Sequence, residues 1–229
     1  MSAAEEEEAW RKRSSVLAAE FMATGAEELF RFEKSDDANG KKGQPEAFAF
    51  TPDTGTLKPL RIADGFGDIE IPFDSMMKFH DKDHFAGIVL AHKLFSHVLD
   101  TCWGSQDIQR DDVHVRCGLN PPGLMDCFEY VARAVTRRRC GDTVLDLDAP
   151  YSPFGRFAFQ ISKGDDVIDL RLRDGLLPDD FAAVGRKVEA GAADGAEIAR
   201  WNSYKFDIGK ALIAMSPEAV LERVDLGAS

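Results

Sequence analysis

Two histidines with helical spacing are the feature of this sequence that most suggests chemistry. His80 and His84 lie four residues apart, with Asp81 and Asp83 beside them. If one helix carries both histidines, their imidazoles share a face, as two ligands of one metal ion must. The aspartates then act as further ligands or orient an imidazole. A structural interpretation stays open, in which the aspartates favour the positive end of a helix and the histidines only form hydrogen bonds.

A thiol and a carboxylate form the second candidate, near the start of a helix that the sequence Asn-Pro-Pro-Gly at 120–123 predicts. Cys127 falls on the apolar side of this helix, where it can reach an interior site. Asp126 is predicted to face away, toward Tyr130 and Arg133. The positive helix end lowers the pKa of a thiol and favours an anion. The alternative is a buried cysteine beside an aspartate that complements the helix dipole.

Tyr151 marks a third candidate, in a loop that also holds Asp148 and Arg156. Such a loop can line a pocket, although a surface salt bridge explains the same residues. The arginines at 137–139 indicate the basic end of a helix, with anion binding as an alternative. The remaining histidines, at 92, 97 and 114, have no companion at ligand spacing and are interpreted as structural. The sequence holds no phosphate-binding loop, dinucleotide fingerprint or nucleophile elbow.

Composition narrows the class of protein. The 229 residues include 40 acidic and 28 basic side chains, for a net charge of −12, and 44% are apolar. The apolar fraction predicts a folded protein. Nucleic acid is not expected as a partner, because nucleic-acid binders usually carry a basic surplus. No stretch is apolar enough for a membrane span, and the acidic N-terminus does not resemble a signal peptide. We therefore expect a cytoplasmic protein. The four cysteines form neither a disulfide framework nor a Cys-x-x-Cys zinc site.

Hydrophobic periodicity predicts an α+β protein with three parts. Residues 1–34 form a helical segment, 35–46 a flexible loop, and 47–229 a single domain with a mixed or antiparallel sheet. Strands are predicted at 47–50, 57–62, 68–71, 113–117, 144–147, 156–161 and 167–172, with the first two paired as a hairpin and the last two joined by a turn. Helices are predicted at 83–102, 120–138, 178–190, 195–213 and 216–223. In these helices Lys93 is expected to point away from the core and Val135 into it. The acidic N-terminal helix is too short to be stable alone, which suggests a homodimer.

Three landmarks between residues 75 and 175 resemble the formylmethanofuran dehydrogenase-related FmdE family. They are 79–87 leading into a helix, 123–129 leading into the next helix, and 155–159 as the following strand. The first is similar to the family motif Phe-His-Gly-His-x-Cys-Pro-Gly, and the second family motif has an Asp-Ala pair shortly after a Cys. The resemblance implies a mixed α+β fold, a dimer, a metal at the His/Cys cluster and a link to one-carbon metabolism on methanofuran or methanopterin.

This chain departs from the family pattern at its thiols. Phe85 stands near the expected Cys of the first motif, and Gly123 stands where the second motif has its Cys. No C-terminal zinc ribbon follows residue 175. The resemblance therefore implies a metal ligand directly only at His80. In place of the family's second imidazole and lost thiol it leaves His84 and Cys127 as replacements. A site of His and carboxylate ligands favours Zn, Mn or Fe over a metal that prefers soft ligands.

These observations predict a metal-dependent cytosolic enzyme that acts on a small polar molecule by lyase or hydrolase chemistry. The metal would activate water or polarise a carbonyl. The predicted metal ligands are His80, Asp83, His84 and Cys127, and the predicted proton-transfer residues are Asp126 and Tyr151. Two alternatives are a non-catalytic binding or assembly module, suggested by the missing cysteines, and a protein of one-carbon transfer, suggested by the family name.

Overall fold

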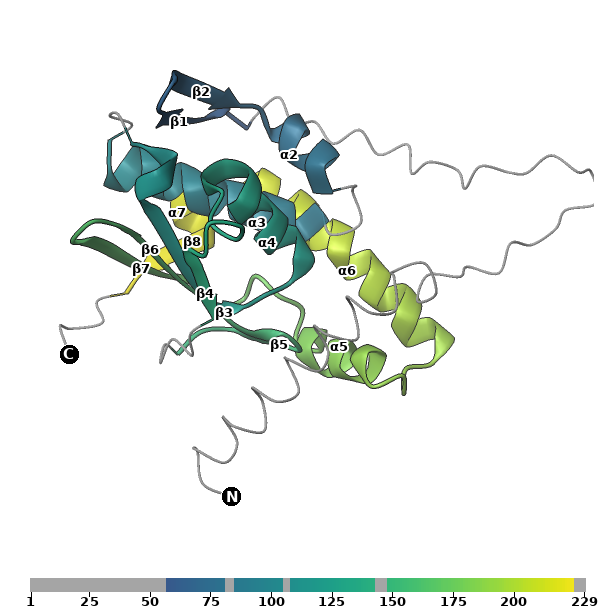
Figure 1. Cartoon of the computed structure of the whole chain (residues 1–229). Helices are drawn as coiled ribbons and strands as arrows, with labels where there is room; N and C mark the ends of the chain where they lie inside the picture. The colour runs from purple at the N-terminus through teal and green to yellow at the C-terminus, as the bar shows by residue number, and fades with distance from the viewer. Residues whose placement is uncertain (1–56, 81–84, 105–107, 143–147, 225–229) are drawn as a thin grey trace, which may run out of the picture. The chain divides into compact units, whose positions relative to one another are not determined.

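The computed structural model describes residues 57–80, 85–104, 108–142 and 148–224 (Figure 1). These residues form an α+β fold with mixed and antiparallel sheets, which confirms the predicted class. The predicted helical segment 1–34, the loop 35–46 and the strands 47–50 and 144–147 lie outside the described residues.

The main sheet is built around two long strands joined by a tight turn. Its strand order is β4-β3-β6-β7-β8, with β5 paired to the start of β6, and all pairs are antiparallel except β3 with β4. The turn 163–166 between β6 and β7 is the one predicted from the sequence. The strands are β3 (Val113–Leu119), β4 (Cys140–Asp142), β5 (Tyr151–Ser152), β6 (Gly155–Lys163), β7 (Asp166–Leu172) and β8 (Leu221–Arg223).

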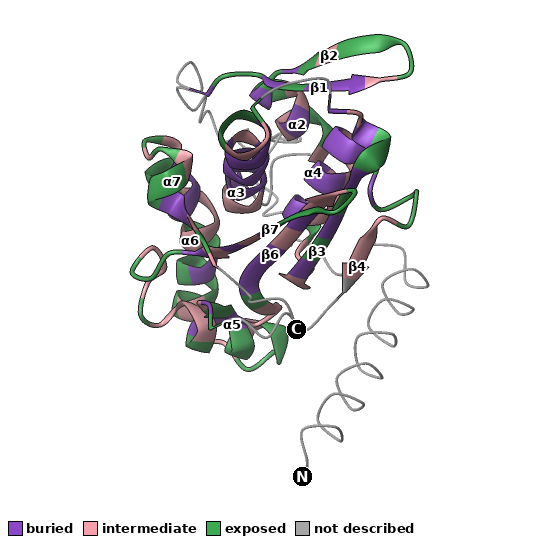
Figure 2. Ribbon diagram, turned by 90° about the vertical axis from the view of Figure 1, so that its left-hand side faces the viewer, coloured by how far each residue is buried: buried purple, intermediate pink, exposed green. Residues whose placement is uncertain are grey.

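Alternation along the strands gives this sheet one apolar and one polar face. In β3 every second residue is buried, and His114 and Arg116 between them are exposed. On the polar face the Arg116 guanidinium donates to the Gln160 side chain at 2.8 Å, and the Gln160 amide donates to Asp169 at 2.8 Å. The apolar face is covered by the helices α3 (Phe85–Ser96) and α4 (Pro122–Ala132), as Figure 2 shows.

Helix α3 is the centre of the core, and it continues as a π-helix, η2 (His97–Cys102). Together they confirm the predicted helix over residues 85–102, and its first two residues lie outside the described residues. The prediction that Lys93 points outward is wrong, because this side chain is buried and donates to the carbonyls of Ile213 and Met215. Ile213 is the last residue of helix α6 (Gly195–Ile213), whose last carbonyls lack partners inside the helix, and Met215 lies two residues beyond it. Burial lowers the pKa of Lys93, and the two carbonyls accept hydrogen bonds from its ammonium group.

Helix α4 ends six residues earlier than predicted. Arg133 adopts a left-handed conformation with φ 51° and donates its N–H to the Glu129 carbonyl, while Ala134 donates to the Phe128 carbonyl. The bond from Arg133 to Glu129 is that of an αL ending, in which a left-handed residue, usually glycine, stops the helix. Val135 beyond it is exposed, so its predicted burial is wrong.

Two arginine side chains complete the end of α4 from outside the helix. The Arg110 guanidinium donates to the Val131 carbonyl at 2.9 Å, and Arg139 donates to the Ala132 carbonyl at 2.9 Å. Arg110 belongs to a short 3-10 helix, η3 (Arg110–Asp112), just before β3. The last carbonyls of a helix need such partners, and a cation there also complements the helix dipole.

The C-terminal region is helical as predicted until Val220. It contains α5 (Phe181–Glu189), α6 with a capping box between Asp194 and Glu197, and α7 (Pro217–Val220) with Ser216 as its N-cap. The predicted helix 216–223 is too long, because residues 221–223 leave it to form β8 on the edge of the sheet.

A separate hairpin and an additional helix precede α3. The strands β1 (Leu60–Asp64) and β2 (Gly67–Ile71) pair with each other. Helix α2 (Phe73–His80), which the periodicity analysis did not predict, follows Pro72 directly. The Pro72 carbonyl accepts hydrogen bonds from both the N–H and the hydroxyl of Ser75, which fixes the first turn of α2.

We expect Gly155→Ala to lower the free energy of unfolding by about 2–4 kcal/mol. Gly155 has φ 124°, and a Cβ atom there would lie 2.0 Å from the Gly118 carbonyl oxygen. The control is Gly164→Ala, because Gly164 also has a positive φ, 58°, but a Cβ would meet nothing within 4 Å. Urea unfolding of both variants separates the steric clash from the backbone strain. Equal losses in the two variants would contradict this account.

Candidate functional site

A hydrogen bond between His80 and Asp126 joins two of the predicted site residues. The His80 Nδ1 lies 2.6 Å from the Asp126 Oδ2, although 46 positions separate the residues in sequence. The His80 side chain is 5% exposed and that of Asp126 is 45% exposed. A carboxylate oxygen accepts, so the Nδ1–H of His80 is the donor. The prediction that Asp126 faces only toward Tyr130 and Arg133 therefore missed its contact with His80.

Packing of α2 against α4 produces this contact. His80 is the last residue of α2, and Asp126 lies in the second turn of α4. One turn further along α4, the ring of Tyr130 meets the ring of Phe79, with centroids 5.0 Å apart and planes tilted by 35°. Adjacent residues of α2 thus contact positions 126 and 130 of α4, which share a helix face. Phe73 and Met76, on the same face of α2 as His80, are buried in the core.

The first turns of α3 and α4 also meet close to these residues in sequence. A Cβ atom on Gly87 would lie 3.4 Å from the Cα of Gly123. Gly123 therefore lies at a close contact between two helices, in the position where the resembling family has a cysteine. Small residues at such a crossing let two backbones approach closely.

Cys127 lies next to Asp126 but on the buried face of α4, where it is 1% exposed. Burial raises the pKa of this thiol far above its ordinary value, and the nearby Asp126 carboxylate raises it further. A thiolate is the form that binds metals or attacks substrates. Its surroundings thus favour the neutral thiol, and a bound cation would have to overcome this preference.

The other predicted site residues are not placed beside His80. Asp83 and His84 lie outside the described residues. His80 is the last residue of α2, and Phe85 is the first described residue of the helix with the apolar stripe, α3. The condition that one helix carries both His80 and His84 depends on the segment 81–84, which lies outside the described residues. Tyr151 is half exposed in β5, with the Arg156 guanidinium 5.9 Å from its ring centre. β5 contacts α5 at the end of the domain away from α2 (Figure 1), so the structure separates Tyr151 from the His80–Asp126 pair.

The other described histidines have structural surroundings. His92 is buried in α3, where its Nε2–H donates to the Lys58 carbonyl at 2.9 Å and its ring packs edge-on against Phe73. Burial lowers the pKa of His92 to about 4, so its imidazole is neutral. His97 Nδ1 lies 3.5 Å from a Glu218 carboxylate oxygen, a longer contact than that of His80.

Within the described parts of the chain, no group of three or more His, Cys, Asp or Glu side chains is arranged to hold a metal ion. His80 with Asp126 nevertheless matches one element of a metal site. Metal-binding imidazoles usually donate their second ring N–H to a carboxylate, which fixes the tautomer and the ring orientation. The described residues thus supply one oriented imidazole, and the other predicted imidazole and Asp83 fall in the segment 81–84.

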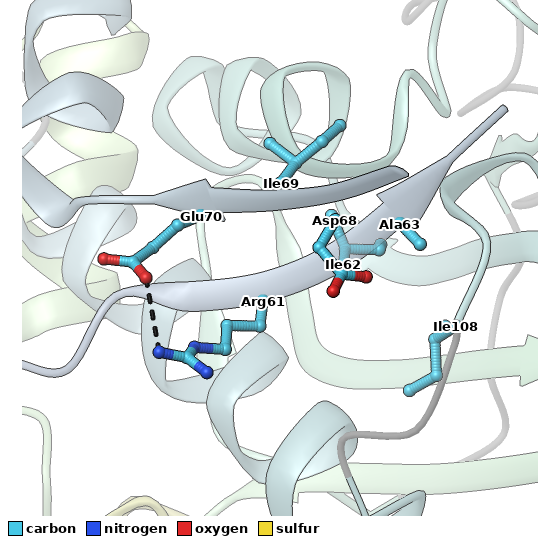
Figure 3. Close-up of a pocket in the computed structure, with 7 residues that line it drawn as sticks. All are labelled: Arg61, Ile62, Ala63, Asp68, Ile69, Glu70 and Ile108. Atoms are coloured by element: carbon cyan, nitrogen blue, oxygen red, sulfur yellow. Dashed lines mark hydrogen bonds and ion pairs between the residues drawn. The ribbon is translucent and has the colours of Figure 1, made fainter. Parts of the chain in front are cut away.

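A surface pocket of about 320 Å³ lies at the β1–β2 hairpin, away from this pair (Figure 3). The Arg61 guanidinium and the Glu70 carboxylate face each other across the hairpin at 3.3 Å, so each already has an opposite charge beside it. No histidine or cysteine is among the described residues that line this pocket. The lining residues are Arg61, Ile62, Ala63, Asp68, Ile69, Glu70 and Ile108.

No protein-family model matches the chain, and no curated protein is significantly similar to it. The resemblance to the FmdE family thus stays a prediction from three motifs. No helix in the described part of the chain is both long and apolar enough to cross a membrane.

The His80–Asp126 contact was missed because α2 was missed. Phe73, Met76 and His80 have the spacing i, i+3 and i+7, which places them on one helix face. This pattern could have identified both the helix and the inward direction of the imidazole. Its partner could not have been found in this way, because it comes from a different helix.

We expect the low pKa of His92 to make the protein less stable in acid. The folded-state pKa of about 4 lies below the ordinary value of 6.5, so the unfolded chain binds the proton first. This contribution is fully present above pH 6.5 and is lost as the pH falls to 4, at a cost of about 3 kcal/mol. Urea unfolding at several pH values should show a shallower acid loss for His92→Gln than for the unmodified chain. His114→Gln, which removes an exposed imidazole, is the matched control. Equal acid losses with and without His92 would refute the prediction.

Proposed function

We propose that the chain is an enzyme that acts on a small polar molecule by lyase or hydrolase chemistry, with His80 and Asp126 at its catalytic centre. The observation that carries this proposal is the 2.6 Å hydrogen bond between a buried imidazole and a carboxylate that is open to solvent on its other side. Imidazole is the side chain best suited to exchange protons near neutral pH.

Within this proposal the two residues have different roles. Asp126 accepts the Nδ1–H of His80, holds the ring in one orientation and stabilises the imidazolium when it forms. His80 removes a proton at Nε2 from water or from the substrate and returns it to the leaving group. Asp126 is therefore a positioning residue, and His80 is the residue that contacts the reacting atoms.

As an alternative use of the same Nε2 lone pair, we propose that His80 is a ligand of a divalent metal, with Zn, Mn or Fe as candidates; in that case His80 is not the proton-transfer residue. The support is the carboxylate on Nδ1, since this arrangement orients metal-binding imidazoles as well as catalytic bases. The ion would activate water or polarise a carbonyl. Asp83 and His84 remain the proposed companion ligands, and Cys127 is disfavoured by the burial that keeps its thiol neutral.

The setting proposed for this enzyme is the cytoplasm, as a homodimer without a nucleic-acid partner. The net charge of −12 supports the last point, because phosphate backbones are bound by basic surfaces. A link to one-carbon transfer is a narrower proposal that rests on the family resemblance alone.

We expect His80→Ala to lower activity at least about 100-fold without unfolding the protein. Asp126→Asn keeps the shape but removes the carboxylate, and it should weaken metal binding about 10- to 100-fold. Activity is measured on a panel of hydrolase and lyase substrates, and bound metal by elemental analysis of protein purified without added metal. The matched control is His97→Ala, which removes another histidine that faces a carboxylate and should leave both measurements unchanged.

The outcomes separate the parts of the proposal. An active protein without stoichiometric metal would refute the metal while keeping His80 as the base. Full activity in His80→Ala would refute the catalytic role. If the unmodified chain is inactive on the whole panel and binds no metal, the non-catalytic binding or assembly module is favoured instead.

A further inference from the structure

The turn that follows helix α4 carries three exposed arginines. Arg133, Arg137 and Arg138 lie within one short segment, and their guanidinium groups form no hydrogen bond or ion pair with any other described residue. Other exposed arginines of the fold differ in this respect, since Arg61 and Arg200 each face a carboxylate. The chain as a whole has a net charge of −12. A group of unpaired cations is therefore a local feature of this turn, opposite in sign to the rest of the chain.

The end of α4 does not need these three side chains. The last carbonyls of the helix already accept hydrogen bonds from the guanidinium groups of Arg110 and Arg139. Arg133 and Arg138 also have left-handed backbone conformations, with φ 51° and 56°. Glycine adopts this conformation with the least strain and is the usual residue at a helix end of this kind. The fold thus gives no reason for an arginine at either position.

Hydrogen bonds hold the turn in one conformation. The Glu129 carboxylate accepts the N–H of Thr136 at 2.9 Å and its hydroxyl at 2.7 Å. The N–H of Arg138 donates to the Val135 carbonyl at 3.0 Å. A partner that binds the side chains of this turn does not have to order its backbone, which lowers the entropic cost of binding.

We propose that this turn binds an acidic segment of a partner protein, in which carboxylates lie among apolar side chains. Guanidinium groups match carboxylates in charge and in the geometry of their paired hydrogen bonds. Val135 lies between Arg133 and Arg137 in the sequence, is 41% exposed and supplies an apolar contact. A bare anion would leave this apolar surface in water, and a nucleic acid would be repelled by the net charge of −12. The inference does not depend on the proposed catalytic function.

The test uses a short fluorescein-labelled peptide of alternating glutamate and leucine, and the same peptide with glutamine in place of glutamate. Binding is followed by fluorescence anisotropy. We expect the unmodified chain to bind the glutamate peptide at least about tenfold more tightly, with an affinity that falls as salt is added. The double variant Arg137→Gln/Arg138→Gln should lower this affinity about three- to tenfold. The control Arg186→Gln/Arg223→Gln removes the same charge from two other exposed arginines and should keep it.

Val135→Ser tests the apolar part of the contact and should lower the affinity for the glutamate peptide about two- to fivefold. An unchanged affinity in this variant, or tighter binding of pyrophosphate or single-stranded DNA than of the peptide, would overturn the acidic segment as the partner. Equal losses in the two double variants would refute the site, because they would show an effect of net charge alone. Equal binding of the two peptides by the unmodified chain would refute it as well. Circular dichroism of each variant separates a loss of affinity from a loss of fold.

Discussion

Burial of α3 on all sides is the constraint on which the rest of the structure depends. Nine of its twelve residues are buried, and a helix that is apolar all round has to be enclosed. The elements that surround it include α2, α4, α6, α7 and β1. Its two buried polar residues also need hydrogen-bond partners. His92 donates to the Lys58 carbonyl, and Lys93 donates to carbonyls at and just beyond the end of α6.

The candidate site follows from this enclosure. Two of the helices that contact α3, α2 and α4, also pack on each other, and their contact brings His80 to Asp126 and Phe79 to Tyr130. The imidazole is held inside the fold while the carboxylate and the Phe79 ring reach its surface. The packing of the two helices thus fixes the orientation of the imidazole, which a positioned proton-transfer group requires.

Elements with strong local patterns were predictable from the sequence. Hydrophobic periodicity within a single segment predicts the strands β3, β6 and β7 and the helices α3 and α6. Weakly patterned elements were not. The three-residue strands β4 and β8 form by pairing with β3 and β7. Helix α4 ends at the left-handed Arg133, where the guanidinium groups of Arg110 and Arg139 donate to its last carbonyls.

The sequence by itself determined the fold class and which side chains are capable of chemistry, because residue type and local spacing are written in it. Only the tertiary structure decided which of these side chains meet. It joined His80 to Asp126, turned Cys127 inward and left Tyr151 at the other end of the domain. The physical reason is that spacing fixes the direction of a residue within its own helix, whereas a contact between two helices depends on how they pack around a shared core.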